Sequence, residues 1–472
     1  MIQDQIVEAA MKELEQKLRQ AMNDLPMDTL SADLAEKVSK GLQQSIRSAA
    51  LAAYRTFLES YDVQEKTIAV EGKILRLKKN PSEKTFLTPF GELKLRRHLY
   101  QADRGGAAYF PLDEHWGMAG EYATPEVQEC LLFGMAHLTA KETENFLKKS
   151  SLFQPSEKAI KNIVDKTGAF IETHVEELNA AIRAEEEAPS ETTAVVASMD
   201  GANVLLRENG QQRGRPQERP GEENSPVTDS AYKNAMVGSI SFYGTSVNDA
   251  GQLEATRLQT RYIARMPEAH FPTFKKQFEK ELEHVENALD EKVTKILLND
   301  GHRTIWNYVD HQERFADYEK LVDFYHTSEH LSHAAEALFG KKSKDADAWY
   351  EKWYDKLLEE DEAANGILRS IDYYAQQLKI PKGRLTDLEK EQIFFQRNQH
   401  RMNYADFIRR GLPIGSGPVE AACKSVVKTR LCRSGMRWSR EGGQKILNLR
   451  VYVKADRWDS FWKNYKQLKR AA

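Results

Sequence analysis

Histidine and acidic side chains occur in this sequence at spacings that could support metal chemistry. The segment HTSEH, residues 326–330, has the spacing in which two histidines of a zinc peptidase hold the metal and the glutamate acts as base. His326, His330 and His333 also fall at helical positions i, i+4 and i+7, so a metal site on one helix face stays open. Packing of that helix face is the other interpretation of His330 and His333.

Two apolar stretches, AVVASMDG and KILLNDG, each end in Asp-Gly, at Asp200 and Asp300. A carboxylate at a strand end can face a cleft and hold a hard cation, although Asp-Gly alone is also a common turn former. A third acid, Glu420, falls in the first turn of a helix expected to begin at Pro418. Three such carboxylates can hold two divalent ions about 3.5 to 4 Å apart for phosphoryl transfer, and Mg²⁺ suits them.

Positive charge is concentrated around and after Glu420. From Arg401 to the end there are seventeen Lys and Arg against five Asp and Glu, whereas the whole chain has a net charge of -3. This segregation favours phosphate contacts over the alternative, a solvated basic face. Trp438 could stack on an unpaired base, or be an ordinary interior tryptophan. The candidate DNA-contacting residues are Lys424, Lys428, Arg430, Arg433, Arg437, Trp438 and Arg440.

The length of 472 residues predicts several domains rather than one. The first residues, MIQDQIVEAAMKELEQKL, carry acids where a signal peptide needs an apolar core, and no stretch approaches the ~18 apolar residues of a membrane span. The three cysteines form no Cys-x-x-Cys pair, which argues against a disulfide framework and a cysteine zinc site. We therefore expect an intracellular, soluble protein.

Periodicity places the candidate residues on an alternation of helices and strands. The first 80 residues read as helical, 81–120 as a small β element, 121–188 as helical again, and the later stretch KLVDFY as a short strand. In this third region Thr139 and Glu142 predict a capping box, and a second helix is expected near Ser156. This pair fits either a DNA-reading helix-turn-helix or a plain helical hairpin. A domain boundary is expected near Pro189, and residues 208–230 read as a solvated, mobile loop.

Several stretches together resemble a known family: SMDG, LNDGHRTIW, LVDFYHTSEHL and, most specifically, GLPIGSGPVEAACKSVVKTRLCRSGMRWSREGGQKILNLRVYV. They are similar to the DDE transposases of bacterial insertion sequences, of the ISKra type within the Mutator-like group. The likeness runs from about Thr85 to Trp462. Many relatives carry a Cys-x-x-Cys in the β element, which here reads YQADRGGAAYFPLDE, so no zinc knuckle is expected.

The resemblance implies an α/β ribonuclease H-like core at 192–335 and 411–472, interrupted by an all-helical insertion at 336–410. It makes Asp200, Asp300 and Glu420 the catalytic, metal-binding triad, with Asp323 and His326 as auxiliary residues. It also implies a helix-turn-helix-like DNA-binding region at 121–188. The region 1–80 is a candidate for dimerisation.

The predicted function is cleavage of insertion-sequence ends and joining of the 3′ hydroxyls to target DNA. We expect Mg²⁺ as cofactor, replaceable by Mn²⁺, and double-stranded DNA (terminal inverted repeats and target) as partner. A homodimer without membrane association, in the bacterial cytoplasm at the nucleoid, is expected. Two alternatives remain: an inactive, transposase-derived DNA-binding protein and, ranked lower, a zinc metallopeptidase using HTSEH.

Overall fold

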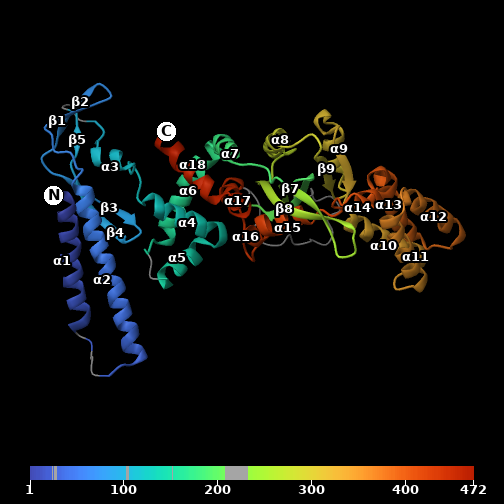
Figure 1. Cartoon of the computed structure of the whole chain (residues 1–472), viewed down its shortest axis with the longest axis horizontal. Coiled ribbons are helices and arrows are strands. Elements are labelled where there is room, and N and C mark those ends of the chain that lie inside the picture. Colours follow the sequence, from blue (N-terminus) through green and yellow to red (C-terminus); the bar gives the residue numbers. More distant parts are fainter. Residues whose placement is uncertain (24, 26–28, 103–105, 151–152, 208–231, 472) are drawn as a thin grey trace, which may run out of the picture. The chain divides into compact units, whose positions relative to one another are not determined.

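The computed structural model describes residues 1–23, 25, 29–102, 106–150, 153–207 and 232–471. The loop predicted at residues 208–230 lies outside this part of the chain. The chain divides into two compact units, one comprising Met1–Thr173 with Trp462–Ala472 and the other His174–Phe461. Each unit contains helices and a β-sheet (Figure 1), which confirms a mixed helix-and-sheet protein with more than one folded unit.

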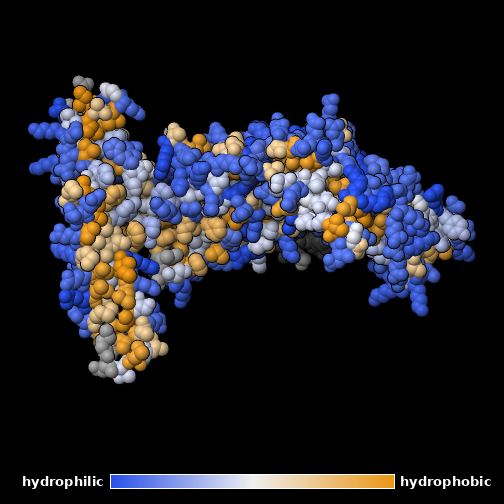
Figure 2. Space-filling view, viewed as in Figure 1, coloured by the Kyte–Doolittle hydropathy of each residue, from blue (hydrophilic) through white to orange (hydrophobic). Residues whose placement is uncertain are grey.

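The first unit begins with two long helices followed by short strands. The order is as expected, but the strands begin at Thr67, inside the region 1–80 that was expected to be helical. Apolar surface runs along the two helices (Figure 2), where Val7, Met11, Leu42 and Ile46 are exposed. The strands form a three-stranded sheet of order β1-β2-β5 and the hairpin β3-β4. These elements are α1 (Ile2–Asn23), α2 (Ala32–Glu59), β1 (Thr67–Val70), β2 (Lys73–Leu77), β3 (Ser82–Thr88), β4 (Gly91–Arg97) and β5 (Tyr100–Gln101).

Helices continue the first unit, and the predicted capping box is confirmed. The Glu142 N–H donates to the Thr139 hydroxyl, and the Thr139 N–H donates to the Glu142 carboxylate at 2.8 Å. The second helix begins near Ser156, as predicted, because the Ser156 hydroxyl accepts from the Ala159 N–H. The helices are α3 (Pro111–Trp116), α4 (Pro125–His137), α5 (Ala140–Lys149), α6 (Glu157–Thr173) and most of α18 (Trp458–Ala471).

The second unit is built on a five-stranded sheet of order β10-β9-β6-β7-β8. The first three strands in sequence are antiparallel neighbours, whereas β9 and β10 run parallel to β6. The side chains of Ile296, Leu297 and Leu298 in β9 are fully buried, as expected for a parallel strand covered on both faces. The strands are β6 (Ala194–Leu205), β7 (Tyr232–Val247), β8 (Leu253–Arg265), β9 (Thr294–Asn299) and β10 (Glu319–Val322).

Helices pack on this sheet, and their contacts bury its apolar side chains. Phe274 and Phe278 of α8 belong to the same buried cluster as Ile240 and Leu297 of the sheet. A π-helical segment, Cys423–Lys428, connects α15 to α16 and lies against β6. The helices are α7 (Val175–Ala184), α8 (Pro272–Asn287), α9 (Arg303–Asp310), α15 (Gly417–Ala422), α16 (Thr429–Leu431) and α17 (Arg440–Lys454).

The predicted helical block also forms, but it begins earlier than residue 336. The stretch KLVDFY was predicted as a strand, yet β10 ends at Val322 because the Asp323 carboxylate accepts the N–H of His326 and starts a helix. The helices are α10 (Phe324–Phe339), α11 (Lys344–Glu359), α12 (Ala363–Gln377), α13 (Lys382–Asn398) and α14 (Tyr404–Arg409), with short 3-10 turns at Glu313–Phe315 and Gln399–Arg401. Within the described ranges, none of the helices combines the length and apolarity that a membrane crossing requires.

Candidate active site

Strand register brings Asp200 and Asp300 side by side. Each paired residue of β6 lies opposite the residue 100 positions later in the parallel strand β9. The Met199 N–H, just before Asp200, donates to the side-chain oxygen of Asn299 at 2.6 Å. The next residue in each strand is an aspartate, so the two carboxylates occupy neighbouring places in the sheet.

The same register adds a third aspartate to the row. Each residue of β10 pairs with the residue 23 positions earlier in β9. The Asp323 N–H donates to the Asn299 carbonyl at 2.8 Å, directly after the last pair of this ladder. Asp323 therefore follows Asp300 across the sheet. Asp300 and Asp323 come directly after β9 and β10, whereas Asp200 lies within β6, which continues to Leu205.

The glycines after the first two aspartates differ in how closely other side chains approach them. Gly201 lies within β6, so the first Asp-Gly is not a turn, and an added Cβ would meet the Asn234 side chain at 3.2 Å, a tight contact. An added Cβ at Gly301 would meet the Phe394 ring of α13 at 2.2 Å. A side chain at position 301 would therefore displace the ring or the helix, so this position needs glycine.

Electrostatics distinguish the row from an ordinary set of surface acids. Burial raises the pKa of the Asp300 carboxyl, the charge of Asp200 raises it further, and the hydrogen bond from the His302 N–H opposes both effects. Burial also raises the pKa of the Cys423 thiol, which lies beside Asp200. Neighbouring carboxylates that disfavour each other's charge are stabilised by a cation between them.

Asp323 is fully buried, and hydrogen bonds occupy both of its carboxylate oxygens. One oxygen accepts the N–H of His326 at 2.7 Å and the other accepts the N–H of Ser416. Burial alone would raise the pKa of Asp323, but these bonds to His326 and Ser416 hold it below its usual value. Asp323 thereby fixes the start of α10 against the loop that leads to Glu420.

Glu420 is half exposed and lies beside Ser416 and His326, the two residues whose N–H groups bind Asp323. The Ser416 hydroxyl donates to its carboxylate at 3.1 Å, and Nδ1 of His326 lies 3.9 Å from the same oxygen. The Asp323 carboxylate, 3.7 Å from Nδ1 of His326, raises the pKa of His326 to about 9, so the imidazole is charged at neutral pH. The charged imidazole of His326 therefore lies between the carboxylates of Asp323 and Glu420.

The predicted triad is brought together only in part. In the described residues, the groups whose ligand atoms lie within 4.8 Å of one another are Asp323 with His326 and Glu420, and His330 with His333 and Glu391. The set Asp200, Asp300 and Glu420 does not meet that distance. Asp200 lines one pocket together with Asp300 and a separate groove together with Glu420. It is therefore the acid that the pocket and the groove share.

The groove with Glu420 carries part of the predicted basic surface. It has a volume of about 820 Å³, and the exposed Lys424 and Lys428 line it together with Asp200. Arg433 and Arg437 are exposed as well, and the side chain of the exposed Arg440 donates to the Pro267 carbonyl. Cationic side chains thus adjoin the carboxylates, as their proximity in the sequence suggested.

Arg430 differs from the prediction, because its side chain is only 2% exposed and is not available to a DNA phosphate. Its guanidinium lies 5.2 Å from the centre of the Trp438 ring. The Trp438 indole N–H donates to the Leu431 carbonyl at 2.9 Å, and its backbone bridges to the end of β6. Arg430 and Trp438 therefore hold the basic segment to the sheet, while base stacking by Trp438 stays a prediction.

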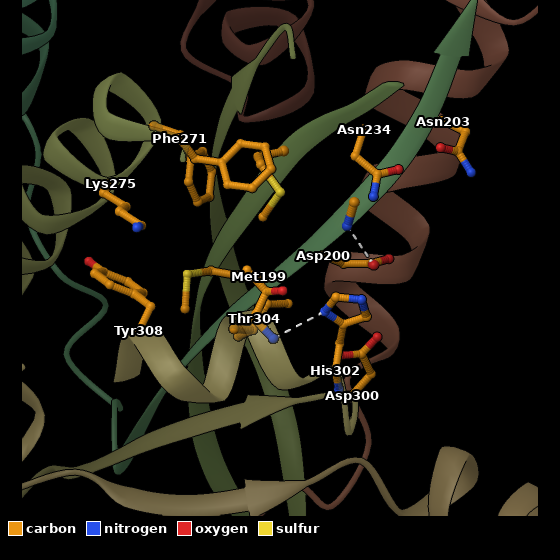
Figure 3. Close-up of a pocket in the computed structure, with 14 residues that line it drawn as sticks. Met199, Asp200, Asn203, Asn234, Phe271, Lys275, Asp300, His302, Thr304 and Tyr308 are labelled. Atoms are coloured by element: carbon orange, nitrogen blue, oxygen red, sulfur yellow. Dashed lines mark hydrogen bonds between the residues drawn. The ribbon is translucent and has the colours of Figure 1, made fainter. Parts of the chain in front are cut away.

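Two cavities beside the acids were not predicted: the pocket that Asp200 and Asp300 line, and a second groove. Figure 3 shows Asp200 and Asp300 on one side of a pocket of about 360 Å³, with Phe271, Lys275 and Tyr308 across from them. A second groove, of about 530 Å³, begins at the residue after Asp300 and is lined by cationic side chains, among them Arg303, Lys390 and Arg397. These residues come from separate helices, so no local sequence pattern links them to the acids.

The HTSEH motif is divided between two groups. His326 lies with Asp323 and Glu420, whereas Nδ1 of His330 lies 2.5 Å from the Glu391 carboxylate. In the peptidase prediction, His326 and His330 would share one ion. The arrangement here instead pairs them with carboxylates of different helices, α15 and α13.

Comparison with known proteins identifies no relative: no protein-family model matches this chain, and no curated protein matches it. The chemistry of the site is therefore argued from its residues and their geometry.

Proposed function

We propose that this chain is a DDE transposase that cleaves the ends of an insertion sequence and joins the freed 3′ hydroxyls to target DNA. The observation that carries the proposal is the row of acids: Asp200 and Asp300 on adjacent parallel strands, with Glu420 across a groove that Asp200 also lines. A phosphodiester bound in this groove would meet carboxylates on one side and Lys424 and Lys428 on the other.

The strand order supports a ribonuclease H-like core. Three antiparallel strands are followed by two that extend the sheet in parallel from β6, and helices separate these last strands. In this topology Asp200, within β6, has as neighbours Asp300 and Asp323, which directly follow β9 and β10. The helical block inserted after β10 returns the chain to the same place at α15, which carries Glu420.

The donor set fits hard divalent cations. Asp200, Asp300 and Glu420 offer carboxylate oxygens, the ligands that Mg²⁺ prefers, and Mn²⁺ takes similar ligands. When bound, such ions would lower the pKa of water and stabilise the leaving oxygen in in-line displacement. The protein's own part is to orient Glu420 through Ser416, to hold the His326 cation beside it, and to bind phosphates with the groove lysines.

Further features support DNA as the partner. The groove beyond Gly301 offers Arg303 and Arg397 to a second stretch of phosphate backbone. Helices α5 and α6 of the first unit are the proposed reading element for the terminal inverted repeats. The exposed apolar residues along α1 and α2 support a homodimer, which light scattering would detect as twice the mass of one chain.

The test is cleavage of labelled duplex DNA that carries the repeats flanking this reading frame. We expect nicking at the repeat ends with Mg²⁺ or Mn²⁺ and none with EDTA. Asp200→Asn, Asp300→Asn and Glu420→Gln should each reduce the rate by about a hundredfold or more, because each removes a charged ligand. Asp317→Asn, an exposed acid of the same unit, is the matched control.

The outcomes separate the proposal from its alternative. Binding of the repeats without cleavage under any metal condition would favour an inactive, transposase-derived DNA-binding protein. Cleavage that persists in all three acid variants would overturn the assignment of the site.

A further inference from the structure

We infer that His330, His333 and Glu391 form a zinc site that joins helices α10 and α13. His330 and His333 lie three residues apart on α10, and Glu391 projects toward them from α13. Nδ1 of His330 is 2.5 Å from one oxygen of Glu391, and Nδ1 of His333 is 3.8 Å from the other. The ligand atoms of the three side chains all lie within 4.8 Å of one another.

The chemistry of this set selects zinc rather than magnesium. Two imidazole nitrogens and one carboxylate oxygen make up a common three-residue zinc set, which leaves a fourth position for water. Ligand atoms about 2.0 to 2.2 Å from a tetrahedral ion lie about 3.3 to 3.6 Å apart, so small side-chain rotations would suffice. Magnesium prefers oxygen ligands, which the row of acids at Asp200 and Asp300 supplies instead.

The surroundings of Glu391 also favour a bound cation. Its side chain is buried, with only 8% of the residue exposed, and its two oxygens face the imidazoles of His330 and His333. A buried carboxylate requires a compensating charge or strong hydrogen bonds. The His330 ring stacks on Phe394 at a centroid distance of 3.6 Å, which fixes its orientation as supporting residues do around metal ligands.

This ion would restrain the two helices that it joins, and both helices contact the candidate active site. Phe394 lies between His330 and Gly301, the residue directly after Asp300. The helix that carries both histidines begins at the Asp323 cap and also carries His326. Joining α10 to α13 therefore restrains two elements that position the acids, without placing zinc among them.

The experiment uses the full chain, stripped with EDTA and then titrated with Zn²⁺ in excess Mg²⁺. Bound zinc per chain is measured by elemental analysis, and Co²⁺ is used as a second probe because tetrahedral Co²⁺ has visible absorption bands. We expect one zinc per chain, with affinity at least about tenfold weaker in His333→Ala and in Glu391→Gln. His333 is 62% exposed, so its variant should fold even if Glu391→Gln does not.

Two matched variants show where the ion lies. Glu329→Gln alters the acid within HTSEH, and Glu420→Gln alters the other ligand group; neither should change zinc affinity. Failure to retain zinc, equal affinity in His333→Ala and wild type, or loss of zinc in Glu420→Gln or Glu329→Gln would each overturn the inference. Because zinc content is measured without DNA, this result is independent of whether the chain cleaves DNA.

Discussion

Asp323 organises the candidate site through hydrogen bonds rather than through exposure to a substrate. Asparagine would keep its size, but it has one carbonyl oxygen, and its amide N–H₂ would face a backbone N–H of His326 or Ser416. We predict that Asp323→Asn lowers the free energy of unfolding by about 2 to 3 kcal/mol. Urea unfolding measures this, and the exposed Asp317→Asn should change it by less than about 0.5 kcal/mol. Equal stability of the two variants would show that the cap contributes little.

His326 should make stability depend on pH in a defined direction. Its pKa rises from 6.5 to about 9 in the folded protein, chiefly through the neighbouring Asp323 carboxylate. The stabilisation is therefore complete below about pH 6.5, the unfolded value, and is lost as the pH rises through about 9. Other groups that act on the imidazole are Glu420, Asp300 and Glu329.

The pKa of His326 is 6.5 in the unfolded chain and about 9 in the folded protein. We predict that the melting temperature of metal-free wild-type protein falls more between pH 6.5 and 9 than that of His326→Gln. Calorimetry at a series of pH values measures the difference. His311→Gln, a change at an exposed helix end, is the control and should follow the wild-type curve. Parallel curves for wild type and His326→Gln would contradict the shifted pKa.

At the scale of elements, α13 packs against the end of β9 through a single glycine. An alanine Cβ at Gly301 would approach the Phe394 ring to 2.2 Å, so the ring or the helix must move. We predict that Gly301→Ala costs about 1 to 3 kcal/mol of stability, as overpacking commonly does. Phe394→Leu should relieve part of this cost in a double-mutant cycle, measured by urea unfolding.

A second glycine provides the control for this cycle. Gly383, near the start of α13, has no heavy atom within 4 Å of an added Cβ. Gly383→Ala should therefore be neutral or slightly stabilising, since alanine favours the helix. A loss of stability in Gly383→Ala equal to that in Gly301→Ala would show that steric contact with Phe394 is not the cause.

Local patterns predicted individual elements better than the contacts among them. The buried runs that end at Asp200 and Asp300 are strands β6 and β9, and the capping box at Thr139 forms as expected. The end of β10 was missed because Asp323 acts as a helix cap, a role that alternation of apolar residues does not reveal. Contacts such as Gly301 with Phe394 join distant segments, and no local period encodes them.

The same limit applies to charge. The excess of Lys and Arg after Arg401 predicted a basic surface beside Glu420, and Lys424 and Lys428 are exposed there. Composition could not show that Arg430 points inward onto Trp438, because burial depends on the neighbouring β6. Counts of charge thus predict where a surface lies, and packing decides which side chains form it.

At the scale of the whole second unit, a buried charge network joins segments far apart in sequence. Glu281 of α8 is 3% exposed and pairs with Arg183, Arg261 and Arg457, while Glu186 pairs with the last two. Burial would raise the pKa of Glu281, but Arg457 and the other arginines lower it. The network therefore connects the end of α7, strand β8, helix α8 and the turn between α17 and α18.

Loss of the Glu281 charge should destabilise this unit more than loss of any exposed acid. Glu281→Gln keeps the shape but removes the charged partner of Arg183 and leaves the buried Arg261 and Arg457 with only Glu186, so we predict a loss of about 3 to 5 kcal/mol. Glu283→Gln, an exposed change on the same helix, should be within about 0.5 kcal/mol of wild type. Urea unfolding followed by tryptophan fluorescence separates these outcomes. A loss below about 1 kcal/mol in Glu281→Gln would mean that water compensates the arginines and that apolar packing alone holds these segments together.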